Sequence, residues 1–303
     1  MENIEWKVPE VAVDILTEEL FDEKNISVSV LRLDIVDPLI SGNKIFKLKY
    51  YLLEAISNQA TIITFGGAYS NHLYATAAAC KKFNIHCIGI VRGERSINLS
   101  HTLLFCESQG MQLKFISRSQ YEKKEEHDFL NELLTEFGSH ILIPEGGSGS
   151  KGVTGAEEIA SCFDNDQYSH ICCAVGTGTT LSGLINRCNA NTKLLGFNMV
   201  NKQYDLDSRI DSLHSIERSK NYNLINEYHF GGYARRSQVL LSFMNNFYQK
   251  QRIPTDFVYT GKMLYGIYEL ASKCYFAPGS KVLCIHSGGL QGNLSLPKGS
   301  LVF

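Results

Sequence analysis

Two lysines, three residues apart, are the first candidates for chemistry in this sequence. Lys44 and Lys47 lie in residues 41–49, where a helix is predicted to begin, so their side chains share one face of it. A lysine amine can form an imine with a carbonyl compound, provided that burial and a second cation lower its pKa enough to leave some amine neutral. The segment therefore indicates covalent chemistry on a carbonyl group. The alternative is a hydrated, basic helix end.

A glycine- and threonine-rich loop follows a predicted strand at residues 171–175, which is apolar at every position. Backbone N–H groups at a helix N-terminus and threonine hydroxyls can donate to phosphate oxygens, and glycines let the backbone approach closely. The loop lacks the Gly-Lys-Ser/Thr ending of a nucleotide P-loop and the acidic residue of a dinucleotide-binding motif. We interpret it as a phosphate-binding cup, with an ordinary helix cap as the alternative. Its members are Gly176, Thr177, Gly178, Thr179 and Thr180.

Further polar side chains follow other predicted strands. Ser70, Asn71 and His72 begin an alanine-rich helix after the strand at residues 61–65. The N–H groups at that helix start could hold a carboxylate, although serine and asparagine are also common as simple caps. Ser287 comes directly after the last predicted strand.

These segments must be positioned by a regular framework, and the sequence predicts an α/β fold. Short β-branched runs alternate with longer amphipathic segments, which is typical of βαβ units around mainly parallel sheets. Glycine-rich turns follow four of the strands, and ligands of open α/β sheets bind at the carboxyl ends of strands, so we expect one shared site. Residues 198–230 are polar and are expected to form long loops with one or two helical turns. The predicted strands cover residues 27–34, 61–65, 87–91, 113–116, 141–143, 171–175, 194–197 and 282–286.

Composition excludes several classes of function. The 303 residues are enough for two domains, and 29 basic against 31 acidic side chains give no field that would attract nucleic acid. Nine cysteines without a C-x-x-C pair favour reduced thiols and no metal site. No run of 18 uncharged apolar residues and no apolar signal segment occurs, so we expect a cytoplasmic protein without a membrane partner.

Taken together and in order, these motifs resemble the 1-aminocyclopropane-1-carboxylate deaminase and D-cysteine desulfhydrase family. Members are pyridoxal 5'-phosphate (PLP) enzymes of fold type II, the tryptophan synthase β-like fold. The resemblance spans residues 30 to 292, so the combination is far more specific than any single motif. The residues that carry it are 42–44 with 47–48, 66–72, 144–148, 176–183, 258–262 and 286–289.

The resemblance implies a role for each candidate. Lys44 would carry the cofactor as an imine, Lys47 would assist at its phosphate beside the cup, and Asn71 would lie beside the hydroxyl of its ring. Ser70, Asn71 and His72 would receive the carboxylate of a small amino acid substrate. Tyr233 and Tyr259 would face that substrate.

The resemblance also implies an architecture and an assembly. A small domain, residues 47–156, would be inserted in a large cofactor-binding domain, residues 1–46 plus 157–303, with the cofactor in the cleft between them. A homodimer is expected.

Thr260 bears on the choice of reaction. Deaminases of the family tend to have glutamate after the tyrosine that matches Tyr259, whereas desulfhydrase-like members have threonine. Thr260 and Ser287 would give the ring nitrogen of the cofactor neutral hydroxyl neighbours, which do not fix it as a cation. We therefore expect a D-cysteine desulfhydrase-like β-elimination that yields keto acid, ammonia and sulfide.

Three alternatives stay open at this point. The chain could be a 1-aminocyclopropane-1-carboxylate deaminase, or another lyase or racemase of the same fold type. It could also be a PLP- or amino-acid-binding protein with little turnover. Phe46 and Lys49 motivate the last alternative, because the family usually has arginine and glutamate at these positions.

Overall fold

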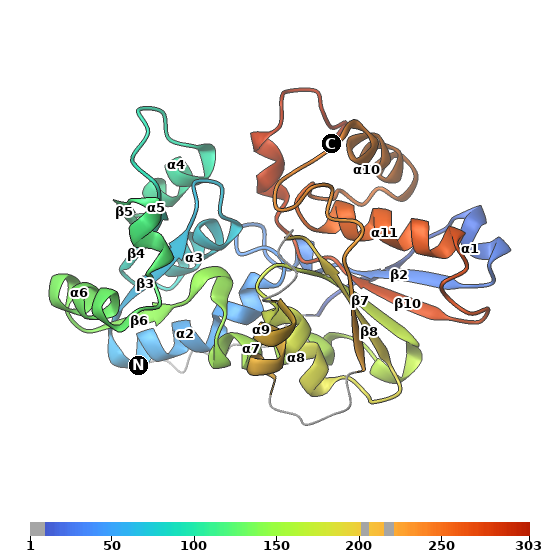
Figure 1. Ribbon diagram of the computed structural model, residues 1–303, viewed down its shortest axis with the longest axis horizontal. Helices are drawn as coiled ribbons and strands as arrows, with labels where there is room; N and C mark the ends of the chain where they lie inside the picture. The colour runs from blue at the N-terminus through green and yellow to red at the C-terminus, as the bar shows by residue number, and fades with distance from the viewer. Residues whose placement is uncertain (1–9, 201–205, 215–220) are drawn as a thin grey trace.

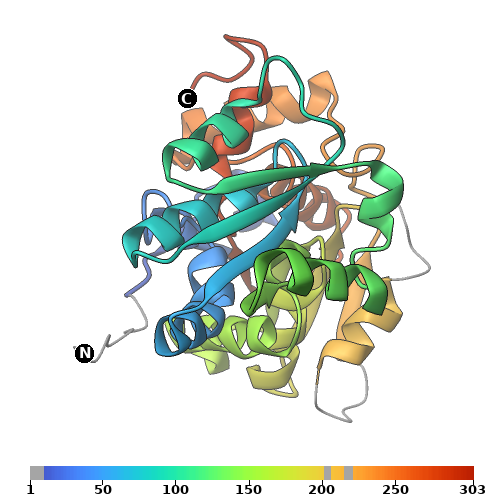
Figure 2. The same ribbon diagram turned by 90° about the vertical axis from the view of Figure 1, so that its left-hand side faces the viewer.

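Two sheets in two lobes form the framework of the computed structural model, which describes residues 10–200, 206–214 and 221–303 (Figures 1 and 2). The larger sheet has six strands in the order β1-β2-β10-β7-β8-β9. All neighbours in it are parallel except β1 and β2. Its strands are β1 (Val13–Ile15), β2 (Ser27–Leu31), β7 (His170–Val175), β8 (Lys193–Asn198), β9 (Tyr222–Ile225) and β10 (Lys281–Ile285).

Strand β7 lies in the middle of this sheet, and all six of its residues are buried. Cys172 and Ala174 belong to one hydrophobic core, whereas Ile171, Cys173 and Val175 belong to a second core on the opposite face. A strand covered on both faces reads as a continuous apolar run. Helices α1 (Glu19–Glu23), α10 (Gln238–Gln251) and α11 (Thr260–Ser272) contribute to the first core, and α7 (Ser150–Glu157), α8 (Thr179–Arg187) and α9 (Leu206–Leu213) to the second.

The smaller sheet has four parallel strands in the order β5-β4-β3-β6. One of its cores is shared with α2 (Lys44–Asn58), α3 (Asn71–Lys82) and α4 (His101–Ser108), and the other with α5 (Arg118–Glu122) and α6 (His127–Phe137). Figure 1 shows this lobe on the left, joined to the larger lobe through α2 and α7. The strands are β3 (Thr61–Gly66), β4 (Cys87–Arg92), β5 (Gln112–Ile116) and β6 (His140–Ile143).

Helices α2, α7 and α8 pack closely where the two lobes meet. Gly155 permits this contact, because a Cβ atom at that position would lie 2.0 Å from the carbonyl oxygen of Phe46. The domain boundaries predicted at residues 47 and 156 fall inside α2 and α7. The division into an inserted and an enclosing domain stays a prediction.

The predicted α/β class is confirmed, and each of the eight predicted strands occurs within a few residues of its expected position. Strands β1 and β9 were not predicted, because β1 has three residues and β9 lies in the polar stretch 198–230. Residues 201–205 and 215–220 of that stretch lie outside the described residues; the rest holds α9 as well as β9. In the part of the chain that the structure describes, no helix has the length and apolar character needed to cross a membrane.

Candidate functional site

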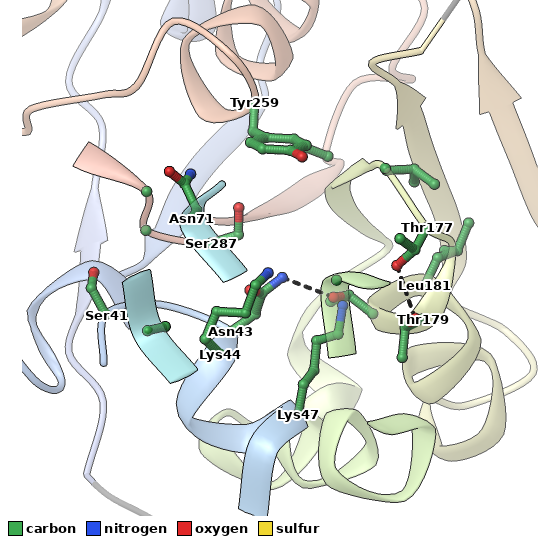
Figure 3. A pocket seen from close by; sticks show the side chains of 18 of the residues that line it. Ser41, Asn43, Lys44, Lys47, Asn71, Thr177, Thr179, Leu181, Tyr259 and Ser287 are labelled. Carbon is green, nitrogen blue, oxygen red and sulfur yellow. Dashed lines mark hydrogen bonds between the residues drawn. The ribbon is translucent and has the colours of Figure 1, made fainter. Parts of the chain in front are cut away.

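A cavity lies where the start of α2, the loop after β7 and the loop after β10 meet (Figure 3). The carboxyl ends of β7 and β10, which are neighbours in the larger sheet, both face it, as expected for a ligand site in an open α/β sheet. Ten of the residues predicted from the sequence line its wall. They are Lys44, Lys47, Asn71, Gly176, Thr177, Gly178, Thr179, Thr180, Tyr259 and Ser287.

Lys44 and Lys47 point into the cavity from the first turn of α2 (Figure 3). Exclusion of water lowers the pKa of Lys44 to about 8, although the negative charge of Asp256 opposes this effect. Lys47 is only 3% exposed, and its pKa lies well below its ordinary value because of burial and, secondly, the charge of Lys44. No described residue accepts a hydrogen bond from the Lys47 ammonium. An anion in the cavity would supply the missing partner.

Asn43 connects the lysines to the predicted cup. Its Nδ2 donates to Oγ1 of Thr180 at 2.9 Å, and its Oδ1 accepts from Nζ of Lys44 at 3.2 Å. At the start of α8, Oγ1 of Thr177 and Oγ1 of Thr179 lie 3.0 Å apart. The cup therefore presents hydroxyls and the free N–H groups of a helix N-terminus to the same space as the two ammonium groups.

The loop that precedes Lys44 packs against the loop that follows β10. Gly42 has a φ of +73°, and a Cβ atom there would lie 1.8 Å from the carbonyl oxygen of Ser287. The same carbonyl accepts a hydrogen bond from the backbone N–H of Asn43 at 3.2 Å. Only glycine fits this approach, so residue 42 fixes Ser287 beside Lys44.

Thr260 does not line the cavity, in contrast to the expectation that its hydroxyl faces the ring nitrogen of a cofactor. It is fully buried, and its Oγ1 donates to Oδ2 of Asp256 at 2.6 Å. Asp256 also accepts from the backbone N–H groups of Val258, Tyr259 and Thr260. Thr260 thus belongs to a capping network at the start of α11, one layer behind Tyr259 and the wall.

Ser70 and His72 also lie outside the wall. The Ser70 hydroxyl caps α3, accepting from the N–H of Leu73 at 3.2 Å, as the capping alternative anticipated. His72 is buried, with Nε2 2.7 Å from Oγ1 of Thr64 and no hydrogen-bond partner at Nδ1. Burial and the charges of Lys44 and Lys47 hold its pKa well below the ordinary value, so His72 is neutral.

Tyr233 is 48% exposed and is placed next to Tyr259 without lining the cavity. The centres of the two rings are 6.0 Å apart in an edge-to-face arrangement. Lys262, which is fully buried, donates to the carbonyls of His229 and Gly232 at 2.9 Å each and so holds the turn that precedes Tyr233.

Phe46 and Lys49, which differ from the usual pattern of the family, point away from the cavity. Phe46 is 2% exposed and packs in the core of the larger sheet. Lys49 forms an ion pair with Glu158 at 2.7 Å. Both residues have structural partners, so their identity does not indicate loss of the site.

Sequence reasoning missed three functional candidates: Asn43, Asp256 and Gln291. Asn43 stands within the motif at residues 42–44, and Asp256 lies two residues before the motif at residues 258–262, but their partners could not be read from the sequence. Gln291 lines the cavity and donates from Nε2 to Oδ1 of Asn71 at 2.7 Å, across 220 positions of sequence. No pattern of neighbouring residues predicts a contact between two residues that are so far apart in the sequence.

The chain is similar to proteins of known name along most of its length. It is 30% identical to the bifunctional D-cysteine desulfhydrase/1-aminocyclopropane-1-carboxylate deaminase of Arabidopsis thaliana, over 84% of this chain and 70% of that protein. It is 24% identical to the D-cysteine desulfhydrase of Serratia proteamaculans, over 86% of each. A solved structure described as an ACC deaminase homologue superposes with a TM-score of 0.80 at 27% identity, covering 94% of this chain and 90% of that one.

The cavity fits a ligand that combines a phosphate with a reactive carbonyl, and PLP carries both of these functional groups. Lys47 is a buried cation without an anionic partner, and the cup beside it consists of donors. Lys44 is close enough to neutrality to act as an amine nucleophile. The family described as pyridoxal-phosphate dependent enzyme matches residues 17–288, and the chain belongs to that family of PLP-dependent enzymes.

Proposed function

We propose that this protein is a PLP-dependent carbon–sulfur lyase that acts on D-cysteine and converts D-cysteine and water to pyruvate, ammonia and hydrogen sulfide. The names of the Arabidopsis and Serratia relatives support this substrate class. The absence of a carboxylate from the cavity wall supports elimination over opening of a cyclopropane ring.

The observation that carries the proposal is the absence of a carboxylate from the wall. Among the described residues that line the cavity, none is aspartate or glutamate, and Ser287 contributes a neutral hydroxyl. The nearest carboxylate behind Tyr259, that of Asp256, is occupied by four hydrogen bonds. A carboxylate would keep the ring nitrogen of the cofactor protonated and strengthen its electron withdrawal, whereas a hydroxyl does not fix that charge. Elimination of thiolate needs less electron withdrawal by the cofactor than ring opening does, because thiolate is a good leaving group.

Lys44 supplies the base in this account. A pKa of about 8 leaves about a tenth of the amine neutral at pH 7, so Nζ of Lys44 would hold the cofactor and can act as the base that accepts the α-proton of the substrate. The bound cofactor supplies an electron sink for the charge left on Cα. Lys47 and the cup would hold the phosphate, and Asn71 would lie at the ring oxygen.

In this proposal, Tyr259 serves the leaving group. Burial, followed by the neighbouring charges of Tyr233 and Asp256, holds its pKa well above the ordinary value, so the phenol keeps its proton at neutral pH. A protonated phenol in the wall can donate to a departing thiolate. Ser70 at the start of α3 remains our proposal for the substrate carboxylate, with Asn71 and His72 beside it and Tyr233 at the outer edge.

The test is a comparison of products from four substrates. The cofactor-loaded protein is incubated with D-cysteine, L-cysteine, D-serine and 1-aminocyclopropane-1-carboxylate, and sulfide, keto acids and ammonia are measured. We expect equal amounts of sulfide, pyruvate and ammonia from D-cysteine. Formation of 2-oxobutanoate from the cyclopropane substrate without sulfide from D-cysteine would contradict the proposal, and so would the absence of product from all four.

Two variants separate catalysis by Lys44 from general damage. Lys44→Ala should abolish turnover, because it removes both the covalent anchor and the base. Lys49→Ala is the matched control on the same helix, since Lys49 pairs with Glu158 outside the cavity. Turnover by Lys44→Ala at the wild-type rate would refute the assignment.

The assembly and the location also belong to this proposal. We infer a homodimer by analogy with the family, and sedimentation analysis tests it. We infer a cytoplasmic location because all nine cysteines are free thiols, seven of them buried.

A further inference from the structure

Gln291 lines the cavity, and the proposed function gives it no role. It belongs to the 3-10 helix η5 (Leu290–Ser295), which follows the Ser287 loop in the larger lobe. Its Nε2 donates to Oδ1 of Asn71 at 2.7 Å, and its backbone oxygen lies 3.0 Å from Nε2 of His101. Asn71 and His101 are the first residues of α3 and α4, both in the smaller lobe. Gln291 therefore contacts the smaller lobe through both its side chain and its backbone.

The position of η5 on the larger lobe is fixed by a neighbouring residue. Nδ2 of Asn293 donates to the carbonyl of Thr255 at 2.9 Å, and its Oδ1 accepts from the N–H of Phe257 at 3.2 Å. These two residues flank Asp256, whose carboxylate caps α11. The 3-10 helix η5, which carries Gln291, is thus hydrogen-bonded to the loop that also carries the wall residue Tyr259.

The hydrogen bond from Gln291 decides what Asn71 offers to a ligand. An asparagine side chain has one acceptor oxygen and an NH₂ group with two donors. Gln291 donates to the oxygen, so the remaining hydrogen-bonding group of Asn71 is the Nδ2 donor, which has no partner among the described residues. Gly289 leaves room for it, because a Cβ atom at residue 289 would lie 2.4 Å from Nδ2. Figure 3 shows Asn71 beside Ser287, across the cavity from Thr177 and Thr179.

We propose that Gln291 is a positioning residue, which holds the amide of Asn71 so that its N–H group, and not its oxygen, faces the ring oxygen of the cofactor. Because Gln291 and Asn71 belong to different lobes, this orientation requires the two lobes to be in contact. The inference rests on the proposed placing of the cofactor ring against Asn71. It does not depend on which amino acid is the substrate.

The expected signature is spectroscopic. With the cofactor bound, the Lys44 nitrogen and the ring oxygen would share a proton, and an N–H donor from Asn71 would stabilise negative charge on that oxygen. Such a donor lowers the affinity of the Lys44 nitrogen for that proton. Loss or reversal of the Asn71 amide therefore raises the pH at which the visible absorbance of the loaded protein changes.

The experiment compares pH titrations of that absorbance without substrate. In Gln291→Glu the ionised side chain only accepts hydrogen bonds, so Asn71 turns its N–H group toward residue 291 and its oxygen toward the cofactor. We expect the midpoint to rise by about one pH unit, a tenfold change in proton affinity, with a smaller rise in Gln291→Met, which has similar length and no donor. Leu294→Ala, at a 69% exposed residue of the same 3-10 helix, should leave the midpoint unchanged.

Unchanged midpoints in both Gln291 variants would overturn the inference. So would loss of cofactor from both variants while Leu294→Ala retains it, because Gln291 would then hold the fold or the cofactor itself. A failed substrate assay with a shifted midpoint would contradict the proposed reaction and leave the positioning role standing.

Discussion

Replacing Lys47 with methionine should have opposite effects on the free and the loaded protein. Methionine keeps the length and the apolar contacts of the side chain and removes the buried ammonium. In the loaded protein, the change would delete the charge-assisted hydrogen bond that we propose between Lys47 and the cofactor phosphate. Such a bond contributes about 1.5–3 kcal/mol, so the dissociation constant of PLP should rise about tenfold to a hundredfold.

In the cofactor-free protein the same change should be stabilising. The pKa of Lys47 in the fold lies well below the value of 10.5 that it has in the unfolded chain. A lysine with a lowered pKa destabilises the fold wherever its amine is protonated in the unfolded chain, and this penalty disappears as the pH rises towards 10.5. Lys47→Met should therefore raise the free energy of unfolding at pH 7.

Two measurements follow, a titration of cofactor-free protein with PLP and denaturant unfolding without it. Lys49→Met is the matched control, two positions along α2, because it loses the ion pair with Glu158 and Lys49 is not among the residues that line the cavity. We expect the control to lower the stability and to leave PLP affinity unchanged. Equal PLP affinity in wild type and Lys47→Met would refute the assignment of Lys47 to the phosphate.

Three other changes test neighbouring features. Lys44→Met should stabilise the cofactor-free protein at pH 7. This gain in the free energy of unfolding should shrink between about pH 8 and 10.5, because the wild-type amine loses its proton there. A gain independent of pH would contradict the lowered pKa. At about pH 10.5, where the lowered pKa of Lys262, about 8, no longer destabilises the wild-type fold, Lys262→Met should lower the free energy of unfolding in denaturant by about 1–3 kcal/mol, because the carbonyls of His229 and Gly232 lose their donor. Unchanged stability at that pH would argue against this role. Gly42→Ala should weaken PLP binding in the same titration, because the new Cβ displaces the Ser287 loop; wild-type affinity would show that the close approach is dispensable.

The sequence predicted the strands, turns and helix faces that depend on short segments of the chain. The apolar run of β7 and the glycine turns after strands follow from short segments, and so does the shared face of Lys44 and Lys47. These features depend on backbone geometry and periodicity, which neighbouring residues determine. All of the predicted cup and lysine residues accordingly line the cavity.

The remaining features depend on partners that are distant in sequence. The family resemblance placed Thr260 beside the cofactor, but Thr260 lies outside the cavity wall, where its hydroxyl donates to Asp256. His72 follows Asn71 by one position, yet it lies on the face of α3 that packs on Thr64. The contact of Gln291 with Asn71 exists only once the two lobes are assembled. Tertiary packing decides which of two adjacent polar residues reaches the site.

The central claim is that Lys44 is the residue that binds the cofactor covalently. Reduction of the PLP-loaded protein with borohydride fixes the linkage, and mass spectrometry of its peptides locates the modified residue. Lys44 and Lys47 are close enough to compete, so the result discriminates between them. A phosphopyridoxyl group on Lys44 is the predicted outcome; the same group on Lys47, or no modified lysine, would contradict the account.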